Sequence, residues 1–105
     1  MIKTQKIIQE LRDTIRRSDP NAEVILYGSQ ARGDARPDSD IDMLIIVNDE
    51  KLTLEKEQKI TFPLYDIELA SGITISPMVV TRWNWENRPF KTPFYINVMN
   101  EGIKL

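Results

Sequence analysis

The run Ile41–Val47, IDMLIIV, constrains the fold more than any other segment of this 105-residue chain. Nearly all of its residues are apolar, so neither face of a strand built from them could remain in water. Such continuous runs are typical of central strands that other elements cover on both faces. Ala22–Tyr27, rich in β-branched and aromatic residues, predicts a second strand. We therefore expect a small mixed β-sheet flanked by helices, in the α/β (α+β) class.

Helical patterns lie around these strands. An N-terminal amphipathic helix is predicted by Ile7, Ile8, Leu11 and Ile15, and it ends at Asp19-Pro20-Asn21. Ser29–Arg32 predicts a short helical turn. Leu54–Ser71 predicts a long helix that follows the capping residue Thr53, ends at Gly72 and has its pattern at Leu54, Gln58, Phe62, Tyr65 and Leu69. Pro63 lies inside this helix, so a kink or two abutting helices are expected there.

The C-terminal third adds a strand and two helices. Ile73–Val80 predicts the third strand, and Pro77 within it favours an edge strand or an irregular centre, because proline cannot donate to a sheet ladder. Helices are expected at 82–87 and 93–101, with Thr81 and Thr92 as N-caps, Pro93 at a first position and Gly102 at an end. All these elements fit one domain over residues 1–105.

The connection between the first two strands carries the candidate functional residues. Gly28-Ser29 follows the first apolar run, and Asp40-Ile41-Asp42 opens the second. Strand residues two apart share a face, so two carboxylates are expected roughly 6–7 Å apart by Cα. Mg²⁺ takes one or two protein carboxylates and completes its shell with water and phosphate oxygens. Gly28 permits a sharp turn, and Ser29 offers a hydroxyl and backbone N–H groups to an anion.

Each half of this pattern also has an ordinary structural explanation. Gly-Ser after a strand is a common turn, and Asp residues at a strand start commonly bond nearby backbone N–H groups. The combination at the ends of two apolar runs favours a functional site.

The pattern Gly28-Ser29, ten residues, Asp40-Ile41-Asp42 resembles the signature of the DNA polymerase β-like nucleotidyltransferase superfamily. GSQARGDARPDSDIDMLIIV is most similar to minimal nucleotidyltransferase domains of prokaryotes. The resemblance implies the nucleotidyltransferase (polymerase β-like) fold. It also implies that Gly28 and Ser29 hold nucleotide phosphates and that Asp40 and Asp42 bind divalent metals, with Mg²⁺ as cofactor and ATP as the expected substrate.

One position departs from this family pattern. Active members carry a third carboxylate on a later strand, whereas Ile73–Val80 contains no Asp or Glu. By register, Ser76, or less favourably Thr74, takes the expected place, and a hydroxyl is neither a general base near neutral pH nor a charged ligand. Asp66 and Glu68 precede this strand in the expected helix. They could replace the carboxylate only if the strand is misassigned.

Two arginines in the connection have alternative interpretations. Arg32 follows Ser29 closely and could bind triphosphate, since arginine binds phosphate bidentately. It could equally bridge Asp34 or Asp38. For Arg36, farther along the loop, the structural role is favoured.

Composition excludes several classes of function. The formal net charge is −2 with scattered basic residues, which argues against nucleic acid as the principal ligand. The chain has no cysteine and no histidine, so thiolate chemistry and histidine-based catalysis are excluded. No apolar run approaches the ~20 residues of a membrane span, and the N-terminus lacks the apolar core of a signal peptide. A cytoplasmic protein is expected.

Large apolar side chains are dense in TRWNWENRPFKTPFYINVMNEGIKL. Trp83, Trp85, Phe90, Phe94 and Tyr95 either pack on the sheet or form a partner surface, since Trp, Tyr and Arg dominate interface hot spots.

Two functions remain open. In the first, the chain is an enzyme that transfers a nucleotidyl group from Mg–ATP to a hydroxyl and releases pyrophosphate. The resemblance then implies a small all-helical HEPN-type protein as partner, with this chain as the antitoxin of the pair and a tyrosine or similar hydroxyl as acceptor. In the second, the missing third carboxylate marks a module that binds nucleotide or partner without turnover. Oligomer formation is compatible with both.

Overall fold

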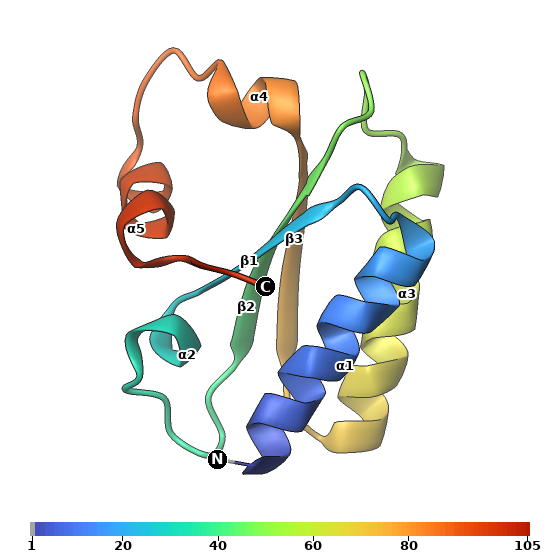
Figure 1. The fold of residues 1–105 in the computed structure, drawn as a ribbon, viewed down its shortest axis with the longest axis vertical. Coiled ribbons are helices and arrows are strands. Elements are labelled where there is room, and N and C mark those ends of the chain that lie inside the picture. The colour runs from blue at the N-terminus through green and yellow to red at the C-terminus, as the bar shows by residue number, and fades with distance from the viewer. Residues whose placement is uncertain (1) are drawn as a thin grey trace.

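The computed structural model describes residues 2–105 and forms a four-stranded sheet between two layers of helices (Figure 1). The strands are β1 (Glu23–Tyr27), β2 (Ile41–Val47), β3 (Ile75–Thr81) and β4 (Ile103–Lys104). The helices are α1 (Ile2–Ser18), α2 (Ser29–Arg32), α3 (Leu54–Ser71), α4 (Arg82–Glu86) and α5 (Pro93–Glu101). Helices α1 and α3 lie on one side of the sheet, and α4 and α5 lie on the other (Figure 1).

Strand β2 lies inside the sheet, whose order is β3-β2-β1-β4. It pairs antiparallel with β1 and parallel with β3, so the sheet is mixed as the sequence predicts. Alternate residues of β2 enter two separate cores. Met43 and Ile45 pack with Leu11 and Leu64 beneath α1 and α3, whereas Leu44 packs beneath α4 and α5. The expected burial of both faces of this strand is confirmed.

Strand β3 is an edge strand, which confirms the expectation drawn from Pro77. It begins at Ile75, two residues later than predicted. The N–H of Ile75 donates to the Glu68 carboxylate at 2.7 Å, so the side chain of Glu68 fixes the start of the strand. Asp66 remains an exposed residue of α3. The strand assignment therefore holds, and neither acidic residue lies on β3.

Helix α3 has the predicted bounds, with the Thr53 hydroxyl accepting from the Lys56 N–H at its start. The apolar residues that predicted the helix lie, however, on the face of α3 that points away from the core. The buried residues are Ile60, Thr61, Leu64 and Ile67, and the large residues of the predicting pattern, Leu54, Phe62, Tyr65 and Leu69, are exposed. Periodicity identified the helix because an exposed apolar stripe repeats at the same spacing as a buried one.

Pro63 lies within one assigned helix, so the alternative of two abutting helices is wrong. Because proline has no N–H, the carbonyl of Lys59 loses its usual intrahelical donor. The hydroxyl of Ser18, at the end of α1, donates to this carbonyl at 3.4 Å. The carbonyl therefore retains a protein donor, which also connects α1 to α3.

The C-terminal segment covers the second face of the sheet. Both threonine caps are confirmed, since the Thr81 and Thr92 hydroxyls accept from Asn84 and Tyr95 N–H groups. The interpretation that the aromatic cluster packs on the sheet is confirmed for part of it, and the partner surface stays a prediction. Trp85 is buried and contacts Phe94 and Tyr95, which are half-buried, whereas Trp83 and Phe90 are exposed. Strand β4, which pairs with β1, was not predicted.

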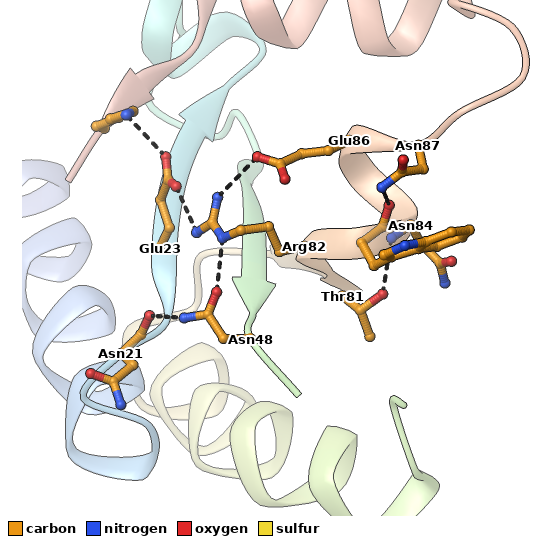
Figure 2. A network of polar contacts seen from close by, with 10 residues as sticks. Asn21, Glu23, Asn48, Thr81, Arg82, Asn84, Glu86 and Asn87 are labelled. Carbon is orange, nitrogen blue, oxygen red and sulfur yellow. Dashed lines mark hydrogen bonds and ion pairs between the residues drawn. The ribbon is translucent and has the colours of Figure 1, made fainter. Parts of the chain in front are cut away.

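A polar network fixes the end of the sheet near α4 (Figure 2). The guanidinium of Arg82 lies 3.0 Å from Glu23 Oε1 and donates to Asn48 Oδ1 at 2.8 Å. The Nζ of Lys104 lies 3.3 Å from Glu23 Oε2. Asn48 in turn donates to the carbonyl of Asn21 at 3.0 Å. Residues of β1, α4, β4 and the loop after β2 are thereby connected around one carboxylate.

Over residues 2–105, the helices are either too short or too polar to cross a membrane.

Candidate active site

The two aspartates lie at the opposite end of the sheet from this network. Asp42 is the second residue of β2 and pairs with Tyr27 of β1. Because the alternate residue Leu44 enters the core beneath α4 and α5, Asp42 faces that side. Asp40 immediately precedes the strand and is exposed. Burial raises the pKa of Asp42, and the nearby negative charge of Asp40 raises it further. The structure thus brings the two carboxylates within electrostatic reach of one another.

Gly28 allows the turn after β1 to approach Asp42 closely. A Cβ atom at this position would lie 2.5 Å from Asp42 Oδ2, much closer than atoms can pack. The φ angle of Gly28 is 74°, in the region that favours glycine. Helix α2 begins at the next residue, Ser29, and its first turn closes on the Gly28 carbonyl, which accepts from the Arg32 N–H at 3.1 Å. Gly28 therefore adjoins Asp42, and Ser29 follows it as the first residue of α2.

Arg32 has the structural contacts that one of its two interpretations predicts. Its guanidinium lies 3.2 Å from Asp34 Oδ2 and 3.4 Å from Glu101 Oε2 on α5. Hydrogen bonds to these two carboxylates raise the pKa of Arg32. Its positive charge also opposes the rise in the pKa of Asp42, so Arg32 acts electrostatically on the site as well.

Arg36 does not form the bridge to Asp34 or Asp38 that was favoured for it. Within residues 2–105 it has no ion pair, and the loop is held instead by its backbone N–H, which donates to Ser39 Oγ at 2.7 Å. Proline and aspartate alongside a serine provide this local turn without the arginine side chain.

The parallel register places Ser76 of β3 opposite Asp42. Residues in register on neighbouring strands point to the same face, so Ser76 occupies the position where a third carboxylate would complete the pair. No cluster of three carboxylate, histidine or cysteine side chains suited to a metal occurs in the part of the chain that the structure describes.

Sequence reasoning missed two residues near the candidate site, one beside Asp42 and one beside Arg32. Tyr27, opposite Asp42 in the β1–β2 pairing, has its pKa raised by burial and then by the charge of Asp42. Glu101 reaches Arg32 from α5. Tyr27, Phe94 and Glu101 line a cavity of about 160 Å³ between α2 and α5. Alternation from Ile25 could have indicated the face of Tyr27, but Glu101 required the tertiary arrangement.

The donor set fits a hard divalent cation. Two carboxylates, one half-buried and one exposed, supply oxygen ligands of the kind that Mg²⁺ takes from a protein. The raised pKa of Asp42 means that its ionised form lacks full compensation from the protein. A cation bound between Asp40 and Asp42 would supply that compensation.

Comparisons with known proteins concern the family and the fold of this chain. A family model described as a nucleotidyltransferase domain matches residues 8–105. A protein of Methanocaldococcus jannaschii named "Putative protein adenylyltransferase" is 39% identical over 82 residues, which cover 78% of this chain and 76% of that protein. A crystal structure titled as a "putative nucleotidyltransferase" from Sulfolobus solfataricus matches 98% of this chain and 79% of its own, with a TM-score of 0.62 and 20% identity. The last match supports the fold.

Proposed function

The chain belongs to the nucleotidyltransferase domain family, and from that premise we propose that it transfers a nucleotidyl group from Mg–ATP to a hydroxyl group. The observation that carries this proposal is the contact between Gly28 and the carboxylate of Asp42, with Asp40 in electrostatic reach. This contact joins the turn suited to phosphate with the carboxylates suited to the cation.

Each residue of the site has a role in this proposal. Asp40 and Asp42 hold the cation, and Gly28 leaves space for Asp42 beside the turn. Ser29 offers its hydroxyl and the amide at the start of α2 to phosphate oxygens. Bound Mg²⁺ would neutralise negative charge on the phosphates and on the departing pyrophosphate.

The proposed reaction forms one bond and breaks one. The acceptor oxygen bonds to the α-phosphorus, the bond between the α-phosphorus and the bridging oxygen breaks, and pyrophosphate leaves. The proton of the acceptor passes to water, because the Ser76 hydroxyl cannot accept it near neutral pH. We therefore expect slow turnover without a further base.

A hydroxyl on a protein is the acceptor that we propose, and a tyrosine is the expected residue. The name of the M. jannaschii relative, which describes a protein adenylyltransferase, supports this choice. Resemblance to minimal nucleotidyltransferases supports a small helical HEPN-type protein as the partner that carries the hydroxyl, with this chain as its antitoxin.

A second function is favoured by Ser76 opposite Asp42. Without a third carboxylate, the site would bind Mg–ATP and a partner but perform no transfer. Ser76→Asp distinguishes the two cases, since a restored general base contributes on the order of 10²-fold or more to a proton transfer.

Labelled ATP tests the proposal directly. With a HEPN-type partner present, label from the α-phosphate should appear in protein, whereas label from the γ-phosphate should not. The Asp40→Asn/Asp42→Asn variant should lose both binding and labelling, because neutral amides cannot replace the charge that holds the cation. Binding without labelling, followed by labelling in Ser76→Asp, would identify the binding module. Failure of the wild type to bind Mg–ATP would refute both functions.

A further inference from the structure

The outer face of α3 carries an apolar stripe that no other element covers in the part of the chain the structure describes. Leu54 is 69% exposed, Phe62 55%, Tyr65 41% and Leu69 82%. Phe62, Tyr65 and Leu69 have the spacing of one helix face, and Leu54 lies about two turns earlier. Single exposed apolar residues are normal on a protein surface, whereas a contiguous row marks an interaction site. The stripe lies on the side of α3 away from Ile60 and Leu64, which face the sheet.

Three exposed charged side chains lie along one flank of this stripe, namely Glu55, Lys59 and Asp66. Lys59 and Asp66 are exposed and lie seven residues, or about two turns, apart on the same flank of α3. Neither forms an ion pair within the described part of the chain. Lys56, on the flank that faces α1, does have partners, at 3.0 Å from Asp19 and 3.5 Å from Asp49. Lys59 and Asp66 are therefore available to an external partner.

We propose that this face binds the same face of a second copy of the chain, with the two α3 helices antiparallel. The midpoint between Lys59 and Asp66 falls between Phe62 and Pro63, and so does the mean position of the four apolar residues. A twofold axis through this point places Lys59 of each copy beside Asp66 of the other. The same axis brings the two Phe62 side chains together and sets Leu54 near Leu69 of the second copy.

Charge distinguishes this arrangement from the alternatives. A parallel twofold pair would put the Lys59–Asp66 flanks of the two copies on opposite sides of the seam, so neither charge would meet its opposite. The antiparallel pair makes two equivalent ion pairs, as an isologous interface requires, and opposes the two helix dipoles. One self-complementary surface therefore buries the apolar residues and pairs Lys59 with Asp66.

The expected dimer is weak. From Leu54 to Leu69 the stripe spans about 22 Å along the helix axis. One pair of helices of this length makes an interface at the small end of specific contacts, so a dissociation constant on the order of micromolar is expected. Because α3 lies on the opposite side of the sheet from Asp42, dimer formation should leave the aspartates accessible.

Sedimentation equilibrium of the full chain tests the proposal. The wild type should change from one to two chain masses across micromolar concentrations, and Leu69→Glu or Phe62→Glu should weaken dimerisation at least tenfold. Phe90→Glu is the matched control, since Phe90 is 78% exposed but lies between α4 and α5, and it should leave the dimer intact. Circular dichroism should show all variants folded, because these side chains are outside the core.

Charge reversal tests the orientation. Lys59→Glu and Asp66→Lys should each weaken the dimer by about threefold to tenfold, and the double variant should recover the wild-type constant. Failure of the double variant to recover would overturn the antiparallel register. A wild type that remains a single chain at millimolar concentration, or a dimer that survives Phe62→Glu, would overturn the proposal itself.

Discussion

The pKa values of two carboxyl groups at opposite ends of the sheet are shifted in opposite directions. At the α4 end, burial alone would raise the pKa of Glu23, but hydrogen bonds and charge from Arg82 and Lys104 outweigh it and lower the pKa. At the α2 end, burial and the charge of Asp40 raise the pKa of Asp42, and Arg32 offsets only part of the rise. Strands β1 and β2 connect the two ends, so the contrast arises within one pair of strands.

This contrast separates stability from function. Glu23 is compensated by the protein itself, and its contacts hold β1, α4 and β4 together. Asp42 is left with a like charge beside it, which costs folding free energy unless a cation binds. Carboxylates with incompletely compensated charge are concentrated at functional sites, where the ligand completes the electrostatic balance. The α2 end is therefore the part of the sheet suited to bind a ligand.

The largest expected effect comes from filling the space between Gly28 and Asp42. In Gly28→Ala, the added methyl would collide with Asp42 Oδ2 and force a left-handed φ on alanine. We expect a loss of about 1–3 kcal/mol in stability from backbone strain. Affinity for Mg–ATP should fall by about 10-fold to 100-fold, because the supporting turn no longer positions Asp42. Thermal melts and isothermal titration with Mg–ATP measure the two effects.

Gly33→Ala is the matched control. Gly33 also has a positive φ, of 83°, but a Cβ there would meet no atom within 4 Å. The variant should lose about 1 kcal/mol from the left-handed conformation alone and keep its affinity for Mg–ATP. Equal losses of affinity in the two glycine variants would show that the contact with Asp42 does not govern binding.

A smaller effect, on stability alone, is expected at the α4 end of the sheet, where Arg82 and Lys104 compensate the charge of Glu23. Arg82→Ala removes the hydrogen bond to Asn48 and the ion pair to Glu23, which leaves a half-buried carboxylate with Lys104 alone. Stability should fall by about 1–2 kcal/mol, while Mg–ATP binding should not change. Arg12→Ala is the control, because among the residues that the structure describes Arg12 pairs with its exposed neighbour Asp13 alone. A loss of nucleotide binding in Arg82→Ala would contradict the separation between the two ends.

Local sequence signals predicted most of the fold. The strand Ile41–Val47, both threonine caps and the edge position of β3 followed from hydrophobicity, hydroxyl side chains and Pro77, which act within a few residues. The short strand β4 was missed because Ile103–Lys104 has almost no pattern and depends on pairing with β1. The exposed apolar stripe of α3 could not be distinguished from a buried one in the sequence, because periodicity shows which residues share a helix face but not whether another element covers that face.

The candidate site also has some features that the sequence predicts and others that depend on the tertiary arrangement. Gly28 and Asp42 could be predicted to lie close together because β1 ends at the turn and the adjoining strand β2 begins with the aspartate motif. The order of the strand residues also predicted Ser76 opposite Asp42. The contact between Arg32 and Glu101 could not, because 69 residues separate them and only the packing of α5 brings them together. Arg36 was expected to bridge a nearby aspartate, but proximity along a loop does not fix a long exposed side chain.

The smallest expected effect is the change in stability when either carboxylate is replaced by an amide. Because this change should have opposite signs at the two ends of the sheet, it tests the contrast between them most directly. The pKa of Glu23 lies below its ordinary value of 4.5, so its charge stabilises the fold above that pH, and this contribution is lost as the pH falls through the lowered pKa. The pKa of Asp42 lies above 3.8, so its charge destabilises the fold once the pH rises through the raised pKa. At pH 7 without Mg²⁺, Glu23→Gln should lower stability and Asp42→Asn should raise it, each by less than about 1 kcal/mol because both side chains retain contact with water. Urea titrations at pH 7 and pH 4 measure these differences, which should shrink at the lower pH. If Asp42→Asn were less stable than the wild type at pH 7, the carboxylate would be compensated in the free protein, and the contrast between the two ends would be lost.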